Sequence, residues 1–168
     1  APIHADGTLG AFVATGTGLP TIRLGLSIAL AGRYLYVLGG ASGAGQSGIA
    51  DIVRMSIDAD DQLAAPATAG STLATATRDH AMISVGNSVY VIGGMTSETD
   101  VTGAVQRAQL GGGALGAFST VPSVSLITPR AGFAAVVAGG YVYAIGGRGS
   151  GGVLGSVERA PILDDDTL

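Results

Sequence analysis

Histidine and carboxylate side chains are the first candidates for chemistry in this sequence. The histidines are His4 and His80, and His80 directly follows Arg78 and Asp79. A hydrolytic nucleophile needs a base within hydrogen-bond reach, but the position of His80 at the start of a predicted strand favours a structural role. The acidic residues fall in predicted turns, whereas the paired carboxylates of glycoside hydrolysis face each other across a cleft. We identify no catalytic residues from the sequence.

Three acidic segments raise the question of a calcium site, because Ca²⁺ prefers oxygen ligands. They are His4–Gly7, Asp58–Asp61 and Asp164–Asp166. A fourth segment at the same phase of the chain is Gly111–Gly113, so the position requires turn geometry instead of charge. We therefore predict neither a metal nor a cofactor, with calcium binding at the acidic turns as the open alternative.

A repeated phrase shows which elements position these residues. It is YVLGG at Tyr36, YVIGG at Tyr90 and YAIGG at Tyr143, and its first glycines, Gly39, Gly93 and Gly146, lie 54 and 53 residues apart. Each repeat reads as four strands, which in the first repeat are Gly25–Ala31, Tyr34–Leu38, a strand near Asp51–Ile57 and a short fourth strand. The fourth strand is predicted at the phase of LGAF, which occurs at Leu9–Phe12 and Leu115–Phe118. Four strands in each period of about 53 residues are typical of propeller blades.

Composition excludes several classes of function. The 168 residues are 47% apolar and 12% charged, which indicates a folded domain. A net charge of −4 gives no general attraction to nucleic acid or to anionic lipid, so we predict neither partner. The uncharged stretches are too short and too rich in glycine for a membrane helix, and the absence of cysteine excludes thiolate chemistry.

The repeat resembles the kelch repeat, over nearly the whole chain. An arginine, an alternating apolar strand, the Tyr–apolar–apolar–Gly–Gly phrase and a strand with a Val–Glu type of start carry the resemblance. The tryptophan common in the fourth strand of that family is absent; Phe12 and Phe118 take its place, with Ala64 or Ala65 in the middle repeat. The resemblance implies an all-β, kelch-type β-propeller with three four-stranded blades in this chain. Proteins with this repeat include copper-radical oxidases of the galactose oxidase type. Their Tyr–Cys cofactor cannot form in this chain, because it has no cysteine.

Two sets of arginines follow the repeat. Arg23, Arg78 and Arg130 lie upstream of the glycine pairs, and Arg54, Arg107 and Arg159 lie downstream. The structural interpretation is that the first set bonds backbone carbonyls and that the second set pairs with acidic neighbours such as Glu158. The functional alternative is a ring of guanidinium groups at the central channel that binds an anion.

One face of the propeller is predicted to carry the variable loops. Because strands alternate in direction, the loop after each glycine pair opens on the same face as the segment that enters each first strand. These loops are Ala41–Gly48, Met95–Gly103 and Arg148–Gly155. A rigid scaffold often presents its binding residues on such loops. The candidate ligand-binding residues are Arg78, Asp79, His80, Glu98, Asp100, Arg148, Arg23 and Arg130.

These observations favour a noncatalytic recognition or scaffold module that binds protein or carbohydrate through the loop face. The alternatives are a glycan-directed hydrolase or lyase with part of its site in another segment or subunit, and a purely structural repeat in a longer surface protein. The absence of lysine and the Gly/Thr/Ser-rich loops lead us to expect an extracytoplasmic or secreted location.

The two ends of the chain share one phase of the repeat. Ala1–Leu9 and Ala160–Leu168 are similar, and the repeats run over about 14–66, 67–119 and 120–168. Propellers have four to eight blades, so three blades leave apolar faces and strand edges uncovered. We predict a homodimer that closes a six-bladed ring, in which the closing strand 9–13 of one subunit completes the third blade of the other. The rival expectation is that the chain is one half of a longer six-bladed polypeptide, since it does not begin with Met.

Overall fold

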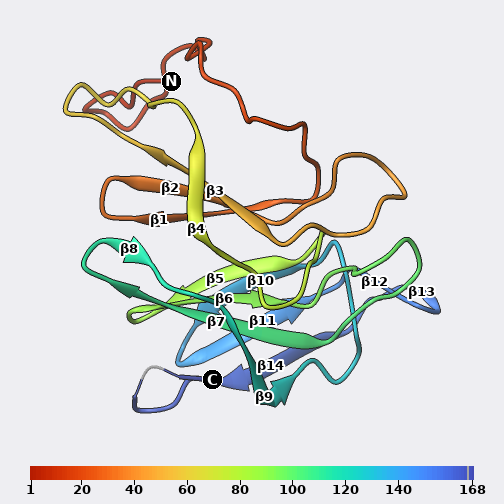
Figure 1. Cartoon of the computed structure of the whole chain (residues 1–168). Coiled ribbons are helices and arrows are strands. Elements are labelled where there is room, and N and C mark those ends of the chain that lie inside the picture. The colour runs from red at the N-terminus through yellow and green to blue at the C-terminus, as the bar shows by residue number, and fades with distance from the viewer. Residues whose placement is uncertain (166) are drawn as a thin grey trace.

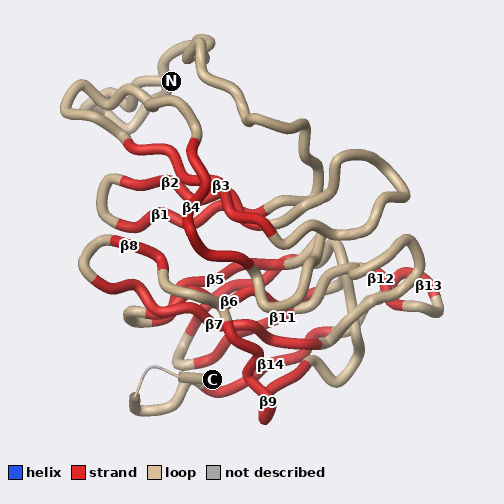
Figure 2. The backbone as a smooth tube through the Cα atoms, in the orientation of Figure 1, coloured by secondary structure: helices blue, strands red, loops and turns tan. Residues whose placement is uncertain are grey.

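The computed structural model describes residues 1–165 and 167–168, and Figure 2 shows strands joined by loops along this length. Among these residues, none forms a helix long and apolar enough to cross a membrane. Figure 1 shows sheets that follow one another from the N-terminal to the C-terminal side of the molecule, with the two termini at opposite ends. The all-β, blade-like architecture expected from the repeat is confirmed.

Each sheet is antiparallel, and its first three strands match the predicted phases. The first blade contains β1 (Ser27–Ala31), β2 (Tyr34–Leu38), β3 (Asp51–Ser56) and β4 (Ala67–Thr72), in that order. The second blade contains β5 (Ala81–Val85), β6 (Ser88–Ile92), β7 (Ala104–Gly111) and β9 (Ser119–Ser125), with β8 (Ala114–Leu115) paired to the end of β7. The third contains β10 (Ala134–Ala138), β11 (Tyr141–Ile145) and β14 (Val157–Pro161), and β12 (Arg148–Gly149) with β13 (Gly152–Val153) forms a separate hairpin.

The third blade of this chain has three strands, whereas the first and second blades each have a fourth. Its last strand, β14, pairs with β11 on one edge, and no other described residue pairs with its outer edge. In the other blades the corresponding edges of β3 and β7 are covered by β4 and β9. The outer edge of β14 is therefore an unpaired strand edge of this chain.

The fourth strands begin later than the sequence indicated. In the LGAF phrase, Leu115 closes a turn with Leu110, and Phe118 is buried just before β9 begins. The segment Leu9–Val13 forms no strand in the chain; Leu9 only bridges to Ile3. The leucine of LGAF recurs because it closes this turn in successive repeats. The residues that form the fourth strand come after the phrase.

The glycine pairs combine positive φ angles with close contact to the next blade. Gly39 and Gly40 have φ angles of 59° and 93°, a region that L side chains rarely adopt. A Cβ at Gly39 would lie 2.6 Å from the carbonyl oxygen of Thr77, which belongs to the segment entering the next blade. The pair therefore ends a strand and lets the neighbouring blade approach closely.

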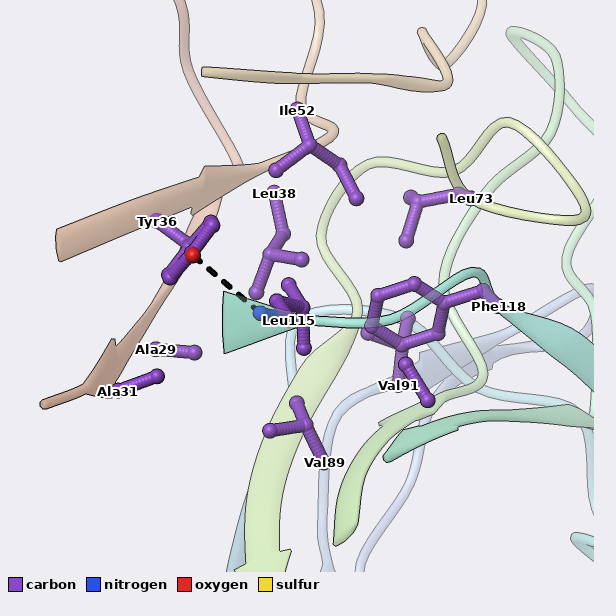
Figure 3. Close-up of a cluster of buried hydrophobic side chains, with 11 residues drawn as sticks. Ala29, Ala31, Tyr36, Leu38, Ile52, Leu73, Val89, Val91, Leu115 and Phe118 are labelled. Carbon is purple, nitrogen blue, oxygen red and sulfur yellow. Dashed lines mark hydrogen bonds between the residues drawn. The ribbon is translucent and has the colours of Figure 1, made fainter. Parts of the chain in front are cut away.

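Neighbouring blades share a hydrophobic core. Between the first two blades, one face of β1, β2 and β3 packs against β6, and Phe118 and Leu115 close the cluster (Figure 3). The backbone N–H of Leu115 donates a hydrogen bond of 3.2 Å to the hydroxyl of Tyr36. A second cluster joins the second and third blades. Each blade thus has two apolar faces, one for the preceding blade and one for the next.

Candidate functional site

The loops that follow the glycine pairs lie beside the segments that enter the first strands, as predicted. Three isolated bridges, one in each blade, make this connection: Leu24 with Ala41, Arg78 with Met95, and Ala131 with Arg148. Neighbouring loops also touch, because Gly48 N–H donates to the carbonyl of Thr96 at 3.2 Å. The three loops therefore form one continuous surface, which we call the loop face (41–48, 95–103 and 148–155).

Arg78 belongs to this face, but the sequence assigned it the wrong equivalents. Its bridge to Met95 matches the bridges of Leu24 and Ala131, so Thr77 occupies the place of Arg23 and Arg130. The Arg78 side chain is buried at 5% exposure. Its Nε donates to the carbonyl of Gln46 at 2.8 Å and its Nη1 to Oδ2 of Asp79 at 2.6 Å. Arg78 thus ties the loop of the first blade to the start of the second.

Asp79 has an unusual backbone conformation. Its φ is 54°, and its equivalents in the other blades are Gly25 and Gly132, with φ of 61° and 60°. The N–H of Asp79 donates to the carbonyl of Gly25 and the N–H of Gly132 donates to the carbonyl of Asp79, each at 2.8 Å. These residues link the starts of β1, β5 and β10 in sequence. A non-glycine residue in this conformation carries strain, which functional sites often retain.

His80 packs between the first two blades. Its Nε2 lies 2.8 Å from the hydroxyl of Ser27, and its Nδ1 lies 3.2 Å from the hydroxyl of Thr77. Burial lowers the pKa of His80 to about 4, although a hydrogen bond with the backbone of Thr77 and the charge of Asp79 act in the opposite direction. The imidazole is therefore neutral at pH 7. Ser27 was not identified from the sequence, although it is the only hydroxyl at a phase where the other blades have Ala81 and Ala134.

The His80 ring fills the same space as an aromatic residue in the next blade. A Cβ at Gly39 would lie 3.0 Å from His80 Cε1, and a Cβ at Gly93 would lie 3.0 Å from Phe133 Cε1. The contact of Ser27 with His80 has the distance of a nucleophile and its base, but Nδ1 faces a hydroxyl where a triad has a carboxylate. This geometry is that of a polar link between blades.

Glu98, Asp100 and Arg148 are exposed on the loop face. Glu98 lies against the first loop, since a Cβ at Gly45 would be 3.3 Å from its Oε1. Asp100 accepts a hydrogen bond of 2.7 Å from the Ser97 hydroxyl, which holds the second loop in its turn. Nη2 of Arg148 lies 2.7 Å from the Met95 sulfur, so the third loop contacts the base of the second. The structure therefore brings these candidates together with Arg78 and Asp79.

Arg23 and Arg130 lie inside the blades. Nη1 of Arg23 donates to the carbonyls of Gly39 and Asp51, and Nη1 of Arg130 donates to those of Gly146 and Ser156. Both guanidinium groups thus tie the end of the second strand to the start of the third. This is the carbonyl-bonding role of the structural interpretation, and it leaves neither side chain open to an anion.

Glu158 completes the arginine link in the third blade, but its partner is Arg130 instead of Arg159. Oε1 of Glu158 lies 2.5 Å from Nη2 of Arg130. Burial raises the pKa of Glu158, but hydrogen bonds from the backbone of Ile127 and Thr128 and from Arg130 outweigh it and leave the pKa lowered. The downstream arginines stack on tyrosines: the guanidinium carbon of Arg159 lies 4.4 Å from the ring centre of Tyr141.

The acidic turns use their carboxylates on their own backbone. Oδ1 of Asp58 accepts hydrogen bonds from the N–H groups of Asp60 and Gln62. Asp6 and Asp165 accept hydrogen bonds from the hydroxyls and the backbone N–H groups of Thr8 and Thr167, and these bonds lower the pKa of both carboxyls. Asp166, in the third acidic segment, lies outside the described residues. Within the described part of the chain, no three His, Asp or Glu side chains gather as a metal site would require.

Comparison with known protein families identifies a kelch motif in this chain. The family model of the kelch motif matches residues 129–159, which run from the segment entering the third blade into β14. The matched segment includes Arg130, the glycine pair at Gly146 and Glu158. No curated protein matches the chain.

Proposed function

Because this chain is a kelch-repeat protein with an all-β, blade-like fold, we propose that it is a noncatalytic recognition module that binds a protein partner through the loop face. The observation that carries the proposal is the juxtaposition of charged side chains from two neighbouring loops on a rigid scaffold. Glu98, Asp100 and Arg148 are exposed there, while the buried Arg78 fixes the first loop from below. A rigid scaffold with polar loops is a common arrangement for recognition.

The loop sequences favour a protein over a carbohydrate as the partner. The segments 41–48, 95–103 and 148–155 contain no aromatic residue, so they offer no flat apolar ring for a sugar to stack on. They do offer two carboxylates and one guanidinium group, which suit the mixed charges and backbone amides of a peptide. An enzymatic function would depend on Ser27 and His80, whose side chains serve as the link between blades. The proposal therefore includes no catalytic step.

A selection from a random peptide library tests this proposal. Peptides selected on the wild-type chain are expected to lose at least tenfold in affinity for a variant with Glu98→Ala, Asp100→Ala and Arg148→Ala, measured by fluorescence anisotropy. The matched control changes the same charges on the opposite face, with Arg33→Ala, Asp60→Ala and Asp164→Ala. Peptides that bind all three proteins equally would show that the loop face is not the recognition surface.

We also propose that two copies of the chain pair. Residues at one phase of the repeat are buried where a further blade follows and exposed where none does. Leu38 and Ile92 are 0% and 4% exposed, whereas Ile145 in the third blade is 43% exposed. On the other side of the molecule, Ile28 and Leu30 of the first blade are 49% and 61% exposed. A second copy could cover both faces and complete a six-bladed ring.

A further inference from the structure

An apolar groove lies between the second and third blades, next to the third blade that lacks a fourth strand. The groove is lined by Ile92, Val105, Leu126, Val142, Ala144, Ala160 and Leu168, among others. One period earlier in the chain, the same phases are Leu38, Ile52, Leu73, Val89, Val91, Ala108 and Leu115.

Those earlier residues surround a phenylalanine. All seven belong to the core cluster that contains Phe118, which is 7% exposed (Figure 3). Figure 3 shows the ring of Phe118 between Leu73, Leu115 and Val91. The groove therefore repeats the environment of Phe118 without a phenylalanine in it. Its occupant is expected to be a phenylalanine that follows a leucine by three residues.

The chain contains a segment with this pattern. Leu9–Phe12 repeats Leu115–Phe118 two periods earlier, and Phe12 is 86% exposed. The residues after Phe12 match a fourth strand as well, because Val13–Gly18 lies one period before β4 (Ala67–Thr72). The outer edge of β14 lies beside the groove and has no partner among the described residues. Phe12 and the strand after it would thus fill the groove and the edge together.

The buried hydroxyl of Tyr90 also indicates that the groove lacks an occupant. Tyr36 accepts a hydrogen bond from the N–H of Leu115, but its equivalent, Tyr90, has a buried hydroxyl without a partner in the described chain. The residue in the Leu115 position beside Tyr90 is Leu168. A buried hydroxyl without a partner costs stability. An inserted segment that orders the residues around Leu168 would allow the Leu168 N–H to donate a hydrogen bond to the Tyr90 hydroxyl.

The occupant cannot be the same molecule's own segment in this fold. The N-terminal segment lies beyond the first blade, whereas β11 and β14, which line the groove, lie toward the other end of the molecule (Figure 1). Leu19, which ends the segment, already packs on Val37, Val53 and Met55 of the first blade. That face of the first blade is the one that would meet the third blade of another copy. Gly10–Gly18 of the second copy would then lie beside the groove.

We infer that the groove between the second and third blades binds Phe12 of a second copy of this chain, whose Val13–Gly18 pairs with the outer edge of β14. This inference rests on the proposed pairing of two copies. In the groove, Leu168 already takes the position that Leu115 has beside Phe118. The inserted segment therefore begins at Gly10, and the hairpin of Ala1–Leu9 stays outside the groove. The exchanged strand is therefore 13–18, in place of the 9–13 expected from the sequence.

A labelled peptide tests the groove independently of self-association. The peptide Gly10–Pro20 is added to the full chain carrying Phe12→Ala, which removes the competing side chain, and binding is followed by fluorescence anisotropy. The peptide is expected to bind at least tenfold more tightly than the same peptide with alanine at Phe12. Ala160→Phe, which fills the groove from the partly exposed strand β14, is expected to abolish binding. Val153→Ala, at an exposed residue of β13, is the control.

The molecular mass of the protein in solution distinguishes the insertion of Phe12 from the pairing of two copies. Light scattering after size exclusion is expected to give a dimer for the wild type and for a chain without Ala1–Leu9, and a monomer for Phe12→Ala. A dimer that persists in Phe12→Ala would keep the pairing and overturn the insertion of Phe12. Equal binding of the two peptides would also overturn it. If the groove binds the peptide but the wild-type chain stays monomeric at every concentration, the occupant belongs to a longer polypeptide and the second-copy assignment is overturned.

Discussion

At the scale of single residues, His80 shows how one position can be both polar and part of the packing between blades. Its ring takes the space that Phe133 takes in the next blade, and its two nitrogens bond Ser27 and Thr77. The neutral ring keeps both bonds, whereas a protonated ring would place a charge at a buried site. The stability of the chain should therefore depend on the protonation of this residue.

The free energy of unfolding is expected to fall as the pH drops from 6.5 to 4. Burial lowers the pKa of His80 to about 4 in the folded chain, while an unfolded chain keeps the ordinary value of 6.5. In this window the unfolded state binds more protons, so acid favours unfolding, by about 3 kcal/mol once the pH is below both values. Urea unfolding at several pH values measures the effect.

The phenylalanine of the third blade supplies a matched variant for this prediction. His80→Phe should remove most of the pH dependence between 6.5 and 4, because Phe133 shows that a ring of this kind fits the site. His4→Phe, at an exposed histidine, should leave the dependence as it is. An unchanged pH dependence in His80→Phe would show that other groups cause it.

At the scale of elements, buried arginines bond both the end of a blade's second strand and the start of its third strand. Arg130 donates five hydrogen bonds, to Thr128, Gly146, Ser156 twice and Glu158, and it is 0% exposed. In the second blade, Gln106 bonds the backbone of Thr75 at the phase of Glu158. Both blades thus link the segment that enters the blade to the third strand. The link is an arginine–glutamate pair in the third blade and a glutamine bonded to the backbone in the second.

Removal of the Arg130 side chain should destabilise the third blade strongly. Arg130→Ala removes the positive charge paired with the Glu158 carboxylate and a donor to the carbonyls of Gly146 and Ser156 in a buried site, which typically costs about 3–5 kcal/mol. Arg148→Ala, at an exposed arginine of the loop face, should cost less than about 0.5 kcal/mol. Guanidinium unfolding measures both losses, and equal values for the two variants would contradict the role assigned to Arg130. Arg130→Ala with Glu158→Gln should recover part of the loss, because the buried charge is gone.

At the scale of the whole molecule, the third blade presents a face that is covered in the other blades. Ile52 and Val105 are 1% and 2% exposed, and Val157 at the same phase is 58% exposed. This face, with Ile145, is the surface that we expect to meet the first blade of a second copy. Its exposure in a single chain leaves a contiguous apolar surface beside an open strand edge.

A charge on this face should prevent the pairing of two copies without unfolding the chain. Ile145→Asp is expected to convert a dimer, with twice the chain mass of 16.4 kDa, into a monomer. Its circular dichroism should stay that of the wild type, because Ile145 is already 43% exposed. Val153→Asp, at 93% exposure on β13, should remain dimeric. Analytical ultracentrifugation over a range of concentrations measures the mass. A wild-type chain that stays monomeric at millimolar concentration would refute the pairing.

The sequence by itself determined the blade as a unit. The glycine pairs and the alternating strands before them are local signals, since positive φ and strand alternation depend on neighbouring residues along the chain. β2 at Tyr34–Leu38 was therefore predicted with its observed bounds, and β1 and β3 nearly so. The loop face also followed from the sequence, because strand direction alternates in any antiparallel sheet.

Only the tertiary structure decided which equivalent residues have the same role. Arg78 follows the spacing of Arg23 and Arg130, but backbone bridges place Thr77 in their position, because pairing between segments sets the register. The fourth strand likewise lies after LGAF, where the edge of the third strand is free to pair. Leu38, Ile92 and Ile145 share one phase of the repeat, yet they differ in exposure because burial depends on whether another blade follows. Repeated sequence thus specifies each blade, and contacts between blades specify what each residue does.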